Sequence, residues 1–300
     1  MNRGITWKAF SPVTSVRWLK RLKQPHQLRN LLRGSNRSVR IIFASAMAEH
    51  SKNESQLIDK LFAAGAHFGL IRSRRHPSVK PFLFGIKNRV EIFDLVKTSE
   101  ALLTAKNFVK QIGASGGILL FVGGKTEAKD AIRGGTGSIS MPYVAGRWLG
   151  GTLTNFAEIR KRIAKLVELT AQRERGELAK YTKKERVLID REIDRLQEFF
   201  SGLVTLTALP KALFVVDPRR EINAVREARH LKIPIVALAS SDCNVHEVDY
   251  PVPGNDASKA SIEFVVSEIV SAFAEGRKAA PAAAAAESGA SEAGEVTLRR

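Results

Sequence analysis

The sequence has very little cysteine, since Cys243 is the only one in 300 residues. This excludes an intramolecular disulfide and any zinc site built from several cysteines, and it is typical of a reducing compartment. His246 lies three positions later, but no further cysteine or histidine is nearby to complete a metal set. No run of about 18 apolar residues occurs, so we expect no membrane span and no membrane partner.

Acidic residues are missing from positions 1–46, which hold ten Lys or Arg. Three explanations remain open: an organellar transit peptide, a basic arm, or sequence upstream of a start at Met47. We therefore treat residues 1–54 as a basic extension that is disordered, cleaved or not translated. At the other end, residues 278–300 are rich in Ala with Ser, Gly and Glu, and are predicted to be disordered.

Basic residues outnumber acidic ones strongly, with a formal net charge of +18 and a pI near 10.3. Without positions 1–46 the chain still has 38 basic and 30 acidic residues, a net charge of +8. An excess of this kind indicates a polyanionic partner, either nucleic acid or an acidic membrane surface. It says nothing about the fold.

Short β-type runs alternate with helical runs between residues 55 and 277, which we expect to form one α/β domain. The expected strands are 90–96, 117–122, 141–144, 211–216 and 233–239. Several are continuous apolar runs, typical of strands buried on both faces of a parallel sheet. The sequence therefore predicts a parallel sheet flanked by helices, a three-layer arrangement of the Rossmann or flavodoxin-like kind.

A pair of long charged helices interrupts this alternation at residues 152–203. Apolar residues at spacings of three and four predict helices from Thr152 to Arg175 and from Thr182 to Gly202, turning near Gly176. We expect an inserted antiparallel helical hairpin whose charges are mostly solvated.

Cations gather in the segment 65–81, whose glycines and prolines predict an irregular loop. Arginine presents a fork of donors that suits phosphate oxygens, so the segment is a candidate phosphate-contact site. Phe82 and Phe84 are expected to anchor the loop and hold its charges in place. The alternative is a solvated charge run.

The stretch Arg147 to Asn155 reads Arg-Trp-Leu-Gly-Gly-Thr-Leu-Thr-Asn and precedes the hairpin. Its two glycines allow a tight turn and close backbone approach. We expect the glycines to serve packing, with Trp148 filling a cleft under the hairpin, and we leave the role of Arg147 open.

An enzyme on a nucleotide or sugar phosphate is the competing class. Gly124-Lys125-Thr126 resembles the end of a Walker A loop, but Leu119 stands where that loop needs a glycine. Lys125 is therefore expected to face solvent or a partner's phosphate. Asp94, Asp217 and Asp242 have no recognisable catalytic spacing, so we expect no catalytic residues, cofactor, bound metal or small-molecule substrate. A free RNA-binding regulator is a third possibility.

Several motifs, in one order, resemble a known family. They are Gly65-Ala66-His67-Phe68-Gly69, Arg74-Arg75 with Pro77, Lys80-Pro81-Phe82, Arg147-Trp148-Leu149-Gly150-Gly151 with Leu153-Thr154-Asn155, Thr182-Lys183-Lys184-Glu185, Ala212-Leu213-Phe214-Val215-Val216-Asp217 and Pro253-Gly254-Asn255-Asp256. In this order they are similar to small-subunit ribosomal protein 2 of the bacterial and organellar type. The resemblance covers about residues 55–277.

The resemblance implies a non-catalytic constituent of the small ribosomal subunit that lies between head and body and supports translation. It further implies contact with small-subunit rRNA and with neighbouring proteins, including recruitment of small-subunit ribosomal protein 1. The particle would be a cytoplasmic bacterial-type ribosome, or a mitochondrial one if residues 1–46 are a transit peptide. By position, the implied rRNA contacts are Arg72, Arg74, Arg75, Lys80, Lys87, Arg89, Arg147, Trp148 and Asn155.

The chain departs from the family pattern at two places. Leu70 stands where members often carry His, and Ala239-Ser240-Ser241 stands where they carry Asp-Thr-Asn. A ligand or metal role of those positions does not carry over.

Overall fold

The computed structural model describes residues 55–295, and residues from Leu57 onward belong to one compact unit. The predictions for residues 1–54 and for 296–300 lie outside the described residues.

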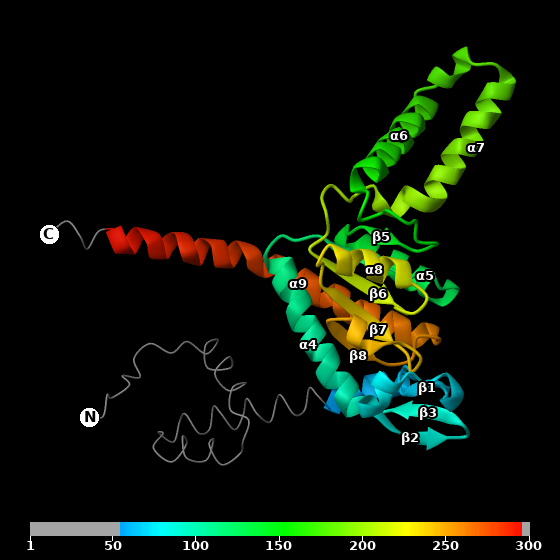
Figure 1. Cartoon of the computed structure of the whole chain (residues 1–300). Helices are drawn as coiled ribbons and strands as arrows, with labels where there is room; N and C mark the ends of the chain where they lie inside the picture. Colours follow the sequence, from blue (N-terminus) through cyan, green and yellow to red (C-terminus); the bar gives the residue numbers. More distant parts are fainter. Residues whose placement is uncertain (1–54, 296–300) are drawn as a thin grey trace. The chain divides into compact units, whose positions relative to one another are not determined.

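A five-stranded sheet forms the centre of the unit (Figure 1). Its strands are β4 (Leu119–Val122), β5 (Tyr143–Val144), β6 (Ala212–Val216), β7 (Ile235–Ala239) and β8 (Tyr250–Pro253). Their order is β5-β4-β6-β7-β8, and every neighbouring pair is parallel. Central β4, β6 and β7 are buried along their whole length. The predicted parallel α/β fold is confirmed.

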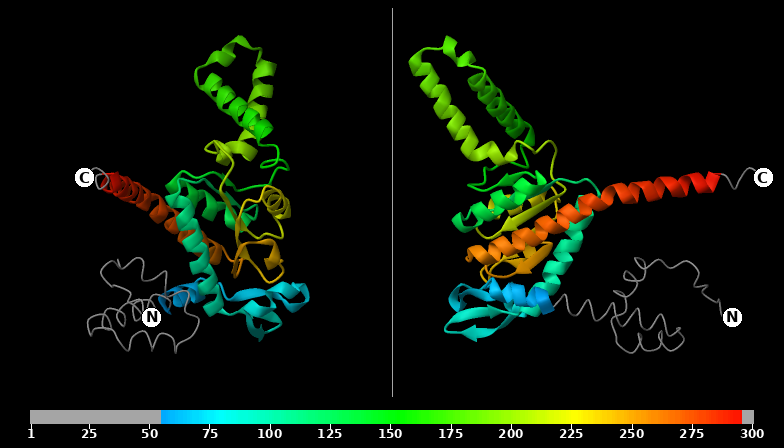
Figure 2. Two further views of the ribbon diagram at one scale, coloured as in Figure 1. Left: turned by 60° about the vertical axis from the view of Figure 1, so that its left-hand side comes forward. Right: turned by 180° about the vertical axis from the view of Figure 1, so that it is seen from behind.

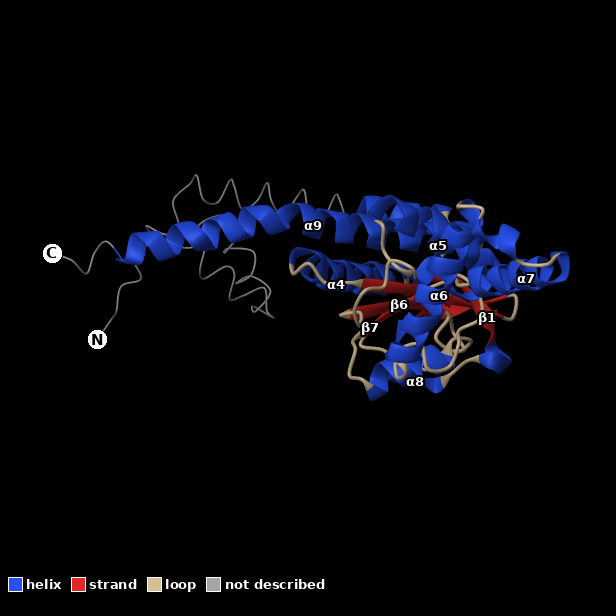
Figure 3. Cartoon of the chain, turned by 90° about the horizontal axis from the view of Figure 1, so that it is seen from above, coloured by secondary structure: helices blue, strands red, loops and turns tan. Residues whose placement is uncertain are grey.

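Helices cover both faces of this sheet, as seen from above in Figure 3. One face packs against α4 (Leu95–Ala114), α5 (Thr126–Ile139) and α9 (Lys259–Glu295), and the other against α8 (Ile222–His230). Successive residues of a strand point to opposite faces of the sheet, so alternate side chains pack against the helices on one face and on the other. Phe121 thus joins the cluster under α4, α5 and α9, whereas Leu120 joins the cluster under α8.

Helices α4 and α9 cross with their backbones in close contact, and glycine permits this. A Cβ on Gly113 would come within 2.5 Å of the carbonyl oxygen of Phe273, and one on Gly276 would collide with the Lys110 carbonyl. Residues without a Cβ let the two helices approach at this point. This close crossing positions two of the helices that cover one face of the sheet.

The predicted hairpin is confirmed and projects from the sheet (Figures 1 and 2). It consists of α6 (Phe156–Glu174) and α7 (Lys183–Phe200), joined by the short 3-10 helix η3 (Glu177–Lys180) and followed by η4 (Ser201–Leu203). Gly176 turns the chain with φ of 73°. Thr182 and Glu185 form a capping box that starts α7. The predicted apolar stripes are buried at the root of the hairpin, as Ile163 and Ile193 show.

A second, antiparallel sheet of three strands was not predicted. Residues 55–63 form a helix, and β1 (Phe68–Ile71), β2 (Leu83–Lys87) and β3 (Val90–Phe93) then pair in the order β1-β3-β2. The prediction of an irregular loop over 65–81 is wrong at β1 and at the 3-10 helices η1 (Arg72–Arg74) and η2 (Pro77–Phe82), while residues 65–67 and 75–76 are irregular as predicted. The strand β1 was missed because its partner β3 is distant in sequence.

Helix α9 continues through the Ala-rich segment to Glu295. The prediction of disorder for 278–300 stays a prediction. Alanine has the highest helix propensity, which favours a helix in an Ala-rich segment. Although α9 is long, neither it nor any other helix within residues 55–295 is apolar enough to cross a membrane.

Candidate nucleic-acid interface

The small sheet brings together the cations that the sequence places in its first basic segment. The turn between β2 and β3 has Asn88 and Arg89 at positive φ, 51° and 66°. Two successive left-handed residues are the geometry of a tight two-residue hairpin turn. The backbone N–H of Arg72 donates to the carbonyl of Arg89 at 3.3 Å, so β1 ends beside this turn. The exposed cations of the region are Arg72, Arg74, Lys80, Lys87 and Arg89.

Arg75 differs from these cations because it has an internal partner. Its Nη1 lies 3.2 Å from Oε1 of Glu91, whose side chain is fully buried. Burial raises the pKa of Glu91, and the charge of Arg75 opposes this rise. Removing Arg75 would leave a buried carboxylate without a cation, which is costly. Arg75 therefore supports the sheet.

Of the two predicted anchors of the basic segment, only Phe82 packs inward. Phe84 is 82% exposed, so the prediction that it anchors the segment is wrong, while Phe82 packs partly against a small core. The anchoring contacts come from η2: Val79 is fully buried, and Ser78 Oγ accepts the N–H of Val245 in the 3-10 helix η5 (Val245–Glu247) at 3.1 Å. His76 N–H also donates to the carbonyl of Ser241 at 2.8 Å.

The stretch 147–155 is organised around Glu227 of α8, which sequence reasoning missed. Its Oε1 accepts Trp148 Nε1–H at 3.0 Å and Gly151 N–H at 2.9 Å, and its Oε2 accepts the N–H of Leu153 at 3.0 Å and of Thr154 at 3.3 Å. Burial would raise the pKa of Glu227, but these donors outweigh it and hold the pKa below its ordinary value. Gly151 has φ of 90°, a conformation that glycine adopts readily.

Trp148 is therefore a packing residue, only 6% exposed and clustered with the root of the hairpin. Arg147 and Asn155 remain exposed. Arg147 lines a small surface pocket together with Arg133, Tyr143 and Glu198. This second group lies on the β5 side near the hairpin, whereas the small sheet lies beyond β8 (Figure 1). The structure does not bring the two groups together.

Lys125 is mostly buried and paired with two carboxylates, so the prediction that it faces solvent or a phosphate is wrong. Its Nζ lies 2.7 Å from Asp217 and 2.8 Å from Asp256, at the carboxyl end of the parallel strands. Burial would lower the pKa of Lys125, but the two carboxylates outweigh it and raise the pKa. A phosphate at this edge would meet carboxylates and a cation that is already paired. The cation at the usual ligand position of an α/β enzyme is therefore already neutralised by two carboxylates.

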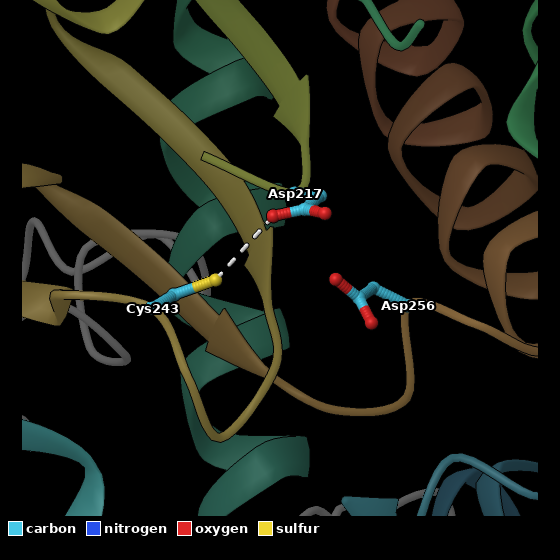
Figure 4. A group of neighbouring side chains, drawn as sticks. All are labelled: Asp217, Cys243 and Asp256. Carbon is cyan, nitrogen blue, oxygen red and sulfur yellow. Dashed lines mark hydrogen bonds between the residues drawn. The ribbon is translucent and has the colours of Figure 1, made fainter. Parts of the chain in front are cut away.

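Cys243 completes this buried group, with Sγ 3.7 Å from Asp217 Oδ1 (Figure 4). Asp217, Cys243 and Asp256 offer atoms within 4.8 Å of one another, the spacing of a metal site. Burial and the neighbouring Asp217 raise the pKa of the Cys243 thiol, which keeps it protonated. Lys125 supplies between the two carboxylates the positive charge that a metal ion would supply.

The described residues thus define an α/β protein with an ion triad at the carboxyl end of its parallel strands and a cluster of exposed cations on an appended sheet. This is the organisation of a binding protein for a polyanion. The family model for ribosomal protein S2 matches residues 61–276, so the chain belongs to the ribosomal protein S2 family.

Two relatives agree with this assignment. The chain is 40% identical over 237 residues to the small ribosomal subunit protein uS2 of Rhodopirellula baltica, covering 77% of this chain and 91% of the relative. It is 42% identical over 221 residues to the protein of the same name from Coprothermobacter proteolyticus, covering 74% and 82%. The chain is therefore a structural component of the small ribosomal subunit that serves translation, and not an enzyme.

Proposed function

We propose that the chain holds small-subunit rRNA through the exposed cations of the small sheet: Arg72, Arg74, Lys80, Lys87 and Arg89. The observation that carries this is the charge of residues 67–93, which include six cations and one acid. That acid, Glu91, is buried and faces Arg75. The remaining cations have no neutralising partner within the segment, which suits phosphate contacts.

A second rRNA contact at the root of the hairpin forms part of the proposal. Arg147 and Asn155 are its exposed members. Trp148 contributes by holding the turn through its bond to Glu227, and not by touching RNA. Arg75 likewise contributes by pairing with the buried Glu91, and not by touching RNA.

The position in the particle and the protein partners follow from the family resemblance alone. We propose that the chain lies between head and body and contacts neighbouring small-subunit proteins, including small-subunit ribosomal protein 1, which it helps to recruit. The bacterial relatives support a cytoplasmic bacterial-type ribosome. A mitochondrial ribosome is the alternative if residues 1–46 are a transit peptide.

Charge reversal on the small sheet tests the rRNA contact. We expect the triple variant R72E/R74E/K87E to show markedly lower occupancy in small subunits after sedimentation, with an unchanged melting temperature, because all three side chains are exposed. If each makes one phosphate contact, the log–log dependence of binding on salt becomes shallower by about 2 to 3 units.

A matched control keeps the net charge change but moves it to the α8 side. The control variant is R226E/R229E/K232E, which also reverses three exposed cations. We expect it to keep near wild-type occupancy. Equal occupancy of the small-sheet variant and the wild type would contradict the proposal.

A further inference from the structure

A small pocket at the root of the hairpin brings together charged side chains from three parts of the chain. Arg133 comes from α5, Arg147 from the segment after β5, and Glu198 from the last turn of α7. The 3-10 helix η4 packs directly on β5, since a Cβ on Gly202 would collide with the carbonyl oxygen of Tyr143. The elements that carry the three charges are therefore held firmly together. We call this pocket the root pocket.

The two arginines of the root pocket are free to bind an anion. Both are exposed, and among the described residues neither forms an ion pair, although Glu198 lines the same pocket. The acid nearest to Arg133 on the same face of α5 is Asp130, and it pairs with Lys259 at 2.9 Å. Two unpaired guanidinium groups on one pocket favour a ligand with phosphate oxygens.

Two glycines of α5 beside Arg133 are not explained by the fold. Gly134 follows Arg133, and Gly137 lies one turn further along the same face. A Cβ on either would meet nothing within 4 Å, and neither has a positive φ. Glycine inside a helix is less stable than alanine, so these positions cost stability without serving packing. They leave the helix surface bare beside the root pocket, where the backbone of a ligand can approach closely.

Glu198 restricts the kind of ligand that the root pocket accepts. A free phosphate or an acidic peptide would suit the arginines, but the Glu198 carboxylate would repel it. An RNA strand carries phosphates and, close to each of them, a ribose 2′-hydroxyl that can donate to a carboxylate. A ribose-phosphate unit therefore complements all three charged side chains.

We propose that the root pocket binds a ribose-phosphate unit of an RNA strand that runs over the bare surface of α5. Arg133 and Arg147 contact its phosphates, and Glu198 accepts a hydrogen bond from a 2′-hydroxyl. The inference rests on the proposed second rRNA contact. It extends that contact from Arg147 to Arg133 and Glu198, which sequence reading did not single out.

Rebinding of the full chain to small subunits assembled without it tests the role of Arg133. Sedimentation at several salt concentrations gives the Kd and its log–log dependence on salt. We expect Arg133→Gln to weaken rebinding about 10- to 100-fold, the value of a lost hydrogen bond to a charged group. The salt dependence should become shallower by about 0.7 to 0.9 units, the value for one phosphate. Arg133→Lys keeps the charge and should keep the slope. Unchanged affinity and slope in Arg133→Gln would overturn the inference.

Gly137→Leu separates RNA contact from folding, because its two expected effects have opposite signs. Leucine forms helices better than glycine, so the melting temperature should rise by about 2 to 3 °C. The new side chain fills the surface over which the strand runs, so rebinding should weaken by about 10-fold or more. Asn107→Leu, at an exposed position of α4, is the control and should rebind like wild type. Rebinding of Gly137→Leu at wild-type affinity would contradict the path of the strand.

Acylation of rRNA 2′-hydroxyls in the rebound subunits reports the contact of Glu198. A hydroxyl that donates to Glu198 should react slowly with wild type bound and faster with Glu198→Leu bound. Glu263→Leu, at an exposed position of α9, is the control and should leave the reactivity pattern unchanged. Identical patterns for wild type and Glu198→Leu would refute the ribose contact.

The results also distinguish this inference from the function on which it rests. Weaker rebinding of Arg147→Gln with wild-type rebinding of Arg133→Gln would keep the second rRNA contact and refute the root pocket. Weaker rebinding of Arg133→Gln with an unchanged salt slope and unchanged 2′-hydroxyl reactivity would mean that a protein covers the root pocket, and would also refute the inference.

Discussion

Replacing Lys125 with Met is expected to lower the free energy of unfolding by about 3 to 5 kcal/mol, because it leaves buried charges without their partner. The Nζ of Lys125 lies within 2.8 Å of both Asp217 and Asp256, whose side chains are only 10% and 2% exposed. Two carboxylates would then face each other at the strand ends with no cation between them.

The loss should depend on pH in a defined direction. Burial and the neighbouring Asp217 raise the pKa of Asp256 from 3.8 to about 6, against the effect of Lys125. A raised carboxyl pKa means that the folded state binds the proton more tightly, so this stabilisation is present below about pH 4 and is lost as pH rises through 6. Without Lys125 the repulsion grows, and the defect should be larger at pH 8 than at pH 5.

Urea unfolding at pH 5 and pH 8 measures the free energy of unfolding. The proteins compared are the wild type, Lys125→Met and the double variant Lys125→Met/Asp256→Asn. The double variant removes one of the two carboxylate charges and should recover part of the stability at pH 8. A Lys125→Met protein as stable as wild type at pH 8 would show that the triad contributes no net stability.

Replacing Glu227 with Gln is expected to destabilise the turn before the hairpin by about 2 to 4 kcal/mol, since several hydrogen bonds to a charged acceptor are weakened together. Glutamine has one acceptor oxygen, and its NH₂ group would face two of the donors now bound by the carboxylate. Trp148 and Gly151 donate to Oε1 of Glu227, and Leu153 and Thr154 donate to Oε2.

Hydrogen exchange at the amides of Gly151 and Leu153 reports this change locally, and urea unfolding reports it globally. We expect faster exchange at both amides in Glu227→Gln. Glu263→Gln, at an exposed position of α9, is the control and should exchange like wild type. Unchanged protection at both amides would contradict the role given to Glu227.

The elements with strong periodicity were predictable from the sequence. The apolar run of Leu119 to Val122 and the stripes through Ile163 and Ile193 give β4 and the hairpin because each signal is local. The capping pattern at Thr182 is also local and marks the start of α7 correctly.

The site depends on partners that sequence reading could not connect. Glu227 is 79 residues from Trp148, and Asp256 is 131 residues from Lys125, so neither pairing has a local signal. The inner and outer sides of β2 depend on a bulge whose position shows only in the strand register. Composition therefore indicated the cations of the first basic segment. It did not indicate that Arg75 forms an ion pair with Glu91, or that Phe84 is exposed.

Photocrosslinking from the small sheet in assembled subunits tests the rRNA contact most directly. A benzophenone amino acid replaces Lys87, which is exposed beside the turn of Asn88 and Arg89, and a second protein carries it in place of Arg226 on α8. Irradiation of purified small subunits should crosslink the Lys87 position to small-subunit rRNA, with far less rRNA crosslinking from Arg226. Crosslinks from the Lys87 position that reach only proteins, in subunits that contain the chain at full occupancy, would contradict the rRNA contact.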